Sequence, residues 1–112
     1  KKLRGVHKPE VIREVVSTLC SLTATREPKL VFESTDVHPM AAAHCSNKEL
    51  HFRWGMTTLC IAIHELAHHV TNMDRRRGAA HGAEFLWTEQ FLFEVFLDEI
   101  LPLWKLREQG LA

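Results

Sequence analysis

The segment "IAIHELAHHV" (residues 61–70) constrains the fold more than any other feature, because it sets three histidines and one glutamate inside an apolar run. The apolar residues around it recur at the 4-3-4 spacing of one buried helical stripe: Leu59, Ile63, Leu66 and Val70. We therefore predict a helix that begins at Thr57 or Thr58 and ends near Thr71. Such a helix buries one side and leaves the other side for polar groups.

Two histidines of this helix are predicted to bind one zinc ion. His64 and His68 are four residues apart, which places their side chains on the same face, one turn apart. Two imidazoles at this spacing can reach one ion at ~2.0–2.1 Å each. Glu65 lies about 100° around the helix from His64, so it stands beside the metal and can act as the general base. Together they form H-E-x-x-H, the zinc-peptidase pattern. The alternative is that both are ordinary helix histidines.

A catalytic zinc ion also needs a third protein ligand, with the fourth position left for water. The metzincin continuation is absent, because Thr71 and Asp74 occupy its Gly and His positions. We predict His81 as the third ligand, since it precedes Gly82 at the start of the next expected helix. Glu84 is the alternative ligand. If His81 binds the metal, Glu84 can instead accept a hydrogen bond from an imidazole.

The rest of the chain predicts an α+β fold with a small antiparallel sheet. The expected elements are a helix over 9–22, a strand over 29–34, a hairpin of 41–46 and 49–54, and a helix over 83–101 that Pro102 interrupts before a short final helix. No repeat or linker divides the sequence, so we expect a single domain over residues 1–112. The predicted order is an N-terminal helix, the sheet, the H-E-x-x-H helix and a C-terminal helix.

Composition excludes several classes of protein. Hydrophobic residues make up 46% of the 112 residues and charged residues 25%, which is typical of a folded globular chain. The formal net charge of zero gives no overall attraction to nucleic acid or an anionic membrane. No apolar run approaches the roughly 18 residues that a membrane span needs. Cys20, Cys45 and Cys60 form no C-x-x-C pair, so we expect free thiols and a cytoplasmic protein.

The remaining histidines and a basic run are weaker candidates. His69 is expected at the surface or beside the ligands rather than on the metal. His38, His44 and His51 are expected as surface or hydrogen-bonded histidines near the strands, with donation to a reaction oxyanion by one of them as the alternative. The run Arg75–Arg77 indicates a solvated loop, with contact to a substrate carboxylate or phosphate as the alternative.

The segments "HELAHHV" and "AHGAEF" resemble the small SprT-like zincins, and also compact metallohydrolases of actinobacteria and their phages. The resemblance covers residues 57–87. It implies a minimal zincin fold, one zinc ion on His64, His68 and His81, and Glu65 as general base. SprT-like proteins often carry a cysteine-rich zinc ribbon, which these residues lack. Because no basic tail is present either, we do not expect a role in clearing protein from DNA.

The sequence thus predicts a zinc-dependent metallohydrolase, most simply a metallopeptidase with a peptide or protein substrate. We expect the substrate to lie along the edge of the hairpin strand near residues 49–54. One alternative is a binding module of the same fold that zinc stabilises without turnover. Another is a hydrolase of non-peptide substrates that uses the same zinc chemistry.

Overall fold

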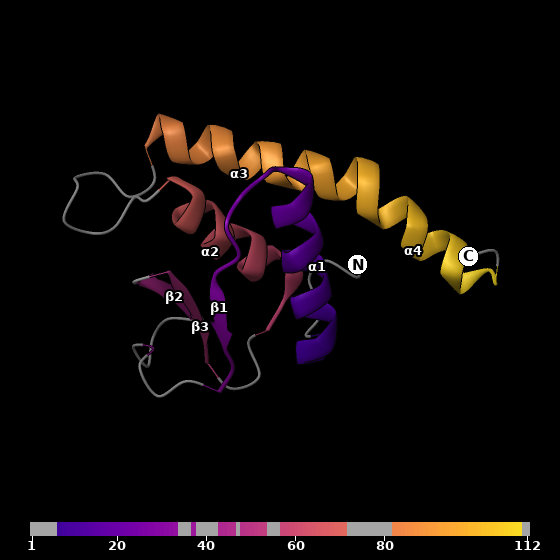
Figure 1. Ribbon diagram of the computed structural model, residues 1–112, viewed down its shortest axis with the longest axis horizontal. Helices are drawn as coiled ribbons and strands as arrows, with labels where there is room; N and C mark the ends of the chain where they lie inside the picture. The colour runs from indigo at the N-terminus through magenta and orange to yellow at the C-terminus, as the bar shows by residue number, and fades with distance from the viewer. Residues whose placement is uncertain are drawn as a thin grey trace.

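The computed structural model describes residues 7–33, 37, 43–46, 48–53, 57–71 and 82–110. Its elements, in chain order, are α1 (Pro9–Leu22), β1 (Lys29–Val31), β2 (Ala43–Ser46), β3 (Glu49–Phe52), α2 (Leu59–Thr71), α3 (Ala83–Val95), the π-helical turn η1 (Phe96–Ile100) and α4 (Leu101–Glu108). Helix α2 lies between the three-stranded sheet and α3, and α1 packs beside it (Figure 1). The predicted α+β class is confirmed.

Helix α1 has the bounds that the sequence predicted, and local features define both of its ends. Pro9 occupies the first turn, where its missing amide hydrogen costs nothing. After Leu22 the chain turns through Ala24, whose φ of 54° is left-handed. The amide of Thr25 then donates to the carbonyl oxygen of Cys20 at 2.8 Å, which closes the helix in a Schellman-type turn.

The sheet has the strand order β1-β3-β2 and is mixed rather than antiparallel. Strands β2 and β3 form the predicted hairpin, with Cys45 opposite Leu50. Because this hairpin covers one side of β3, β1 takes the other side, where it runs parallel to β3 with Leu30 opposite Leu50. The prediction of a purely antiparallel sheet is therefore wrong. The predicted substrate edge near 49–54 is also wrong, because β3 is paired on both sides.

Strand β3 buries residues on both of its faces. Leu50 and Phe52 point into the core and are fully buried, as their alternation predicts. His51 lies on the other face but is only 7% exposed. Its ring stacks on that of His44 across the hairpin at 4.8 Å, and its Nε2 lies 2.9 Å from Oε1 of Glu49. His51 is therefore a hydrogen-bonded histidine rather than a surface one.

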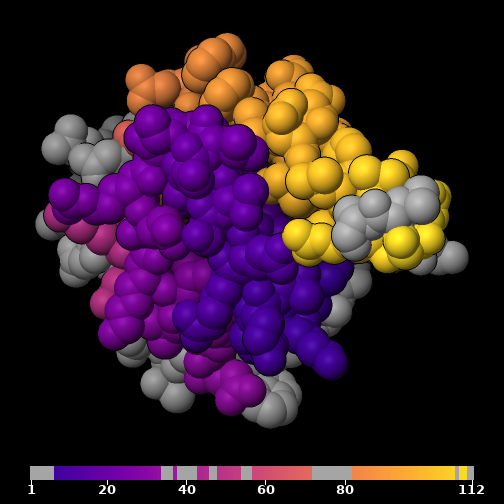
Figure 2. All heavy atoms as spheres, turned by 45° about the vertical axis from the view of Figure 1, so that its right-hand side comes forward, coloured from indigo at the N-terminus to yellow at the C-terminus, as the bar shows by residue number. Residues whose placement is uncertain are grey.

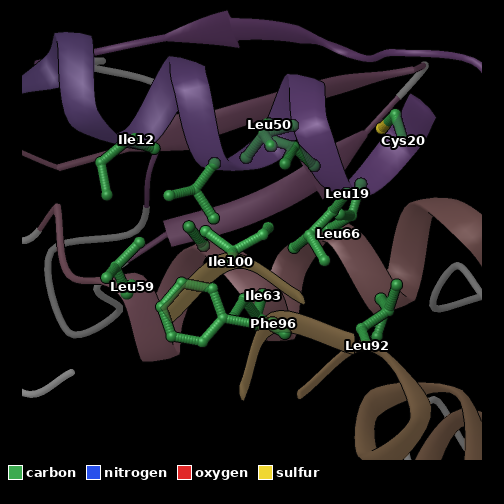
Figure 3. Packing of buried hydrophobic residues seen from close by; sticks show 14 of the residues in the cluster. Ile12, Leu19, Cys20, Leu50, Leu59, Ile63, Leu66, Leu92, Phe96 and Ile100 are labelled. Atoms are coloured by element: carbon green, nitrogen blue, oxygen red, sulfur yellow. The ribbon is translucent and has the colours of Figure 1, made fainter. Parts of the chain in front are cut away.

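The hydrophobic core lies where α1, α2, β3 and the long C-terminal helix meet (Figure 3). Its largest fully buried side chains are Phe52 of β3, Phe85 of α3 and Phe96 of η1, with smaller members from α1, β3, α2 and the last helix: Ile12, Leu19, Leu50, Leu59, Ile63, Leu66 and Leu92. Val70, predicted as the fourth member of the α2 stripe, is instead 37% exposed. It lies in the last turn of α2, beyond Ala67, the last buried residue of this helix.

The last three helical elements follow one another without a break, so the prediction that Pro102 interrupts the helix is wrong. Proline has no amide hydrogen for an α-helical bond to the carbonyl of Asp98. The chain widens into η1 just before it, and the amide of Leu101 donates to the oxygen of Phe96, five residues back. Helix α4 then extends away from the body beside α1 (Figure 2). An exposed ion pair joins the two, with Nη1 of Arg107 3.0 Å from Oε2 of Glu14.

Within the described ranges, no helix is both long enough and apolar enough to cross a lipid bilayer.

Candidate metal centre

Helix α2 presents His64 and His68 on the side that faces α3. The helix begins where the hydroxyl of Thr58 accepts a hydrogen bond from the amide of Ile61 at 3.1 Å, which caps its N-terminus. From this start, the apolar residues Leu59, Ala62, Ile63, Leu66 and Ala67 are buried, and the two histidines are half-buried. The centroids of the two imidazole rings lie 5.0 Å apart at an interplanar angle of 85°. The structure thus brings together the two histidines that the spacing paired.

Phe85 of α3 covers both histidine rings. It stacks on His68 with a centroid distance of 4.3 Å and an interplanar angle of 28°. It meets His64 edge-on at 5.0 Å and 72°. Because Phe85 is only 1% exposed, it forms an apolar wall behind both imidazoles and restricts how they can turn.

Glu89, one turn further along α3, contacts His64 directly. Its Oε2 lies 2.7 Å from Nδ1 of His64, and the two side chains are 23% and 35% exposed respectively. Glu89 was not predicted from the sequence, where Glu84 was expected to make such a contact. The helical spacing could have indicated this contact, because Glu89 is four residues after Phe85 and therefore lies on the same face of α3.

Glu65 is buried, with 8% of its surface exposed. Glu65 also lies close to strand β2, so its negative charge acts on the thiol of Cys45 in that strand. Burial first, and the charge of Glu65 second, raise the pKa of the Cys45 thiol to about 12. A carboxylate so placed is shielded from bulk water, next to the helix face that carries the two histidines. It can exchange a proton with a group bound there.

The third predicted ligand, His81, lies outside the described residues. Glu84, the alternative, is described and has an exposed side chain in the first turn of α3. In the described part of the chain, no three His, Cys, Asp or Glu side chains are close enough together to hold a metal ion. The choice between His81 and Glu84 therefore stays a prediction. Arg75–Arg77 and His38 also lie outside the described residues.

His69 has a structural contact of its own. Its Nε2 lies 2.8 Å from the carbonyl oxygen of Arg26, in the segment that follows α1. A carbonyl oxygen can only accept, so Nε2 carries the proton and donates it. His69 thus ties the end of α2 to the segment after α1, in line with the prediction that it is not a metal ligand.

We compared the chain with protein-family models, with curated proteins and with solved structures, and none of these comparisons gave a match.

Proposed function

We propose that the chain is a zinc-dependent hydrolase that cleaves peptide bonds in peptide or protein substrates. His64 and His68 would each supply one imidazole nitrogen to a single zinc ion, His81 would supply the third, and Glu65 would act as the general base. The observation that carries the proposal is the pair of imidazoles 5.0 Å apart on one face of α2, with a buried carboxylate on the residue after the first.

The spacing of the two rings suits zinc. Imidazole nitrogen is one of the common ligands of zinc, and the ion takes tetrahedral geometry. With zinc–nitrogen bonds of ~2.0–2.1 Å, the centres of two bound imidazoles lie roughly 5 Å apart. The ring centres of His64 and His68 stand at this separation already.

When bound, zinc would polarise the scissile carbonyl and lower the pKa of water toward about 7. Glu65 would accept a proton from the attacking water and pass it to the leaving amine. Because Glu65 is 8% exposed, few water molecules compete for its carboxylate, and its charge acts strongly on groups near it.

A peptide substrate would bind at strand β2 rather than at β3. In the part of the sheet that the structure describes, the open edges belong to β1 and β2. Of these two strands, β2 packs more closely against α2 and holds Cys45 near Glu65. An extended peptide can add to such an edge through main-chain hydrogen bonds. The proposal places the protein in the cytoplasm, where its three free cysteines would stay reduced.

The decisive variant is Glu65→Gln, which keeps the size of the side chain but cannot accept the proton. Zinc content would be measured on the wild type and the variant, and both would be incubated with unfolded proteins and a peptide library. We expect one zinc ion per chain in both proteins, and hydrolysis by the wild type alone. Glu94→Gln, the same change at an exposed residue of α3, is the matched control and should keep full activity.

Two outcomes would contradict the proposal. A wild-type protein without zinc affinity would remove its basis. Zinc bound equally by wild type and Glu65→Gln, with no turnover of any peptide by either, would favour a binding module that the metal only stabilises.

A further inference from the structure

The contact between Glu89 and His64 joins α3 to the metal-binding face of α2 and does more than hold the helices together. We infer that Glu89 is a positioning residue, which fixes the tautomer and the orientation of His64 so that Nε2 of this ring is left to bind the metal. The inference rests on the proposed function and adds a residue that the sequence pattern does not contain. It depends on one distance, 2.7 Å between Oε2 of Glu89 and Nδ1 of His64.

The chemistry of the two groups decides which ring nitrogen carries the proton. An ionised carboxylate can only accept hydrogen bonds, so Nδ1 of His64 must donate. A neutral imidazole has one N–H, and its other nitrogen, Nε2, therefore keeps a lone pair. A histidine that binds a metal commonly donates its second ring nitrogen to a carboxylate in this way.

The surroundings of Glu89 support this role over that of an ordinary surface residue. Residues 84–99 contain five acidic residues and no Lys or Arg, so no basic side chain of this stretch can pair with Glu89. Glu89 is half-buried, whereas the other four acidic side chains of this stretch are exposed. These four are Glu84, Glu94, Asp98 and Glu99. Partial burial of a carboxylate is costly without a hydrogen bond, and His64 provides one.

The same face of α3 also fixes the plane of the ring. Phe85 lies four residues before Glu89 and meets the His64 ring edge-on at 72°. The His64 ring is therefore contacted by two residues of α3: Phe85 packs against one side of it, and Glu89 binds its Nδ1. With Nδ1 engaged by Glu89, Nε2 is the ring nitrogen that would coordinate the metal.

The first test uses the metal-free protein, so it does not depend on turnover. Long-range proton–nitrogen NMR spectra of protein with labelled histidine, recorded at about pH 8 where histidine is neutral, report the tautomer of each ring. We expect the Nδ1–H form for His64 in the wild type and in Glu94→Gln, and a mixture or the other form in Glu89→Ala. An Nε2–H tautomer of His64 in the wild type would overturn the inference.

The second test is a zinc competition titration against a chelator. Loss of a carboxylate behind a ligand histidine typically weakens metal binding by about 10–100-fold, and we expect that loss for Glu89→Ala. Glu89→Gln keeps an acceptor oxygen without the charge and should fall between Glu89→Ala and the wild type. Glu94→Gln, the same loss of one charge on the exposed side of α3, should bind zinc as the wild type does.

The readouts separate positioning from a purely structural role. A carboxylate that only stabilised the packing of α3 would lower the melting temperature of the metal-free protein and leave the tautomer and the zinc affinity unchanged, and that result refutes the inference. Should the wild type itself fail to bind zinc, the proposed function fails. The tautomer measured without metal still decides whether Glu89 orients His64.

Discussion

Truncation of Phe85 should be among the most damaging single changes in the chain, for stability as well as for the proposed metal centre. Phe85 is 1% exposed and packs against both histidine rings. Replacing a buried Phe with Ala removes its transfer energy and leaves a cavity, at a cost of about 3–5 kcal/mol. A domain of this size has roughly 5–15 kcal/mol of stability in total. Phe85→Ala should therefore remove between about a fifth and the whole of the stability.

Trp87 offers a matched control two residues further along α3. It is the larger side chain but is 68% exposed, and its ring stacks on that of Phe91 at 5.7 Å. Losing one such pair costs about 0.5–1.5 kcal/mol, so Trp87→Ala should cost about 1 kcal/mol. If burial decides the energy, truncating the smaller ring must cost several times more than truncating the larger one.

The assay is urea denaturation of the metal-free proteins in chelator, followed by circular dichroism. The free energy of unfolding is compared by extrapolation to water, after checking that the slopes agree. Phe85→Leu keeps most of the apolar volume and should cost about 1–2 kcal/mol, so it serves if Phe85→Ala does not fold. Equal losses in Phe85→Ala and Trp87→Ala, or a loss below about 1 kcal/mol for Phe85→Ala, would refute the packing described for α3.

Three further predictions concern the ligands and a thiol. Purified protein should hold close to one zinc ion per chain by metal analysis, and zinc retained by the double variant His64→Ala/His68→Ala would sink the central proposal. In a chelator competition, His81→Ala should weaken zinc binding far more than Glu84→Gln; the reverse order would make Glu84 the third ligand. The folded protein keeps the Cys45 thiol protonated up to about pH 12, whereas an unfolded chain releases that proton from its ordinary value of 9.0. The free energy of unfolding should therefore fall as pH rises above about 9, less steeply in Cys45→Ala, and parallel urea-denaturation curves across this range would contradict it.

Local signals in the sequence were enough to predict helices α1 and α2. Pro9 marked the start of α1, and the apolar spacing of α2 placed its buried side correctly as far as Leu66. These features depend on residues close together in the chain, so a periodic pattern contains them.

Features that depend on distant segments were not predictable in the same way. The parallel pairing of β1 follows from which side of β3 the hairpin leaves open, and no residue in Lys29–Val31 encodes it. Glu89 lies 25 residues from His64, so its contact follows from how α3 packs on α2. The local spacing was enough to identify the two histidines and Glu65 as candidates. Phe85 and Glu89, which contact the histidines, were identified only in the folded structure.

The wide turn at η1 has a geometric consequence for the long C-terminal helix. Side chains four residues apart in a regular α-helix drift about 40° around the axis at each step, because the helix has 3.6 residues per turn. Leu92, Phe96, Ile100 and Trp104 follow that spacing and would spiral away from the core over three steps. The π-helical turn holds more residues and turns the spiral back, so that Phe96 still meets Trp104 edge-on at 5.6 Å. One extra residue in a single turn thus keeps the apolar side chains of the long helix on the side that faces the core. The same helix can therefore contact His64 and His68 near its start and pack against the hydrophobic core near its end.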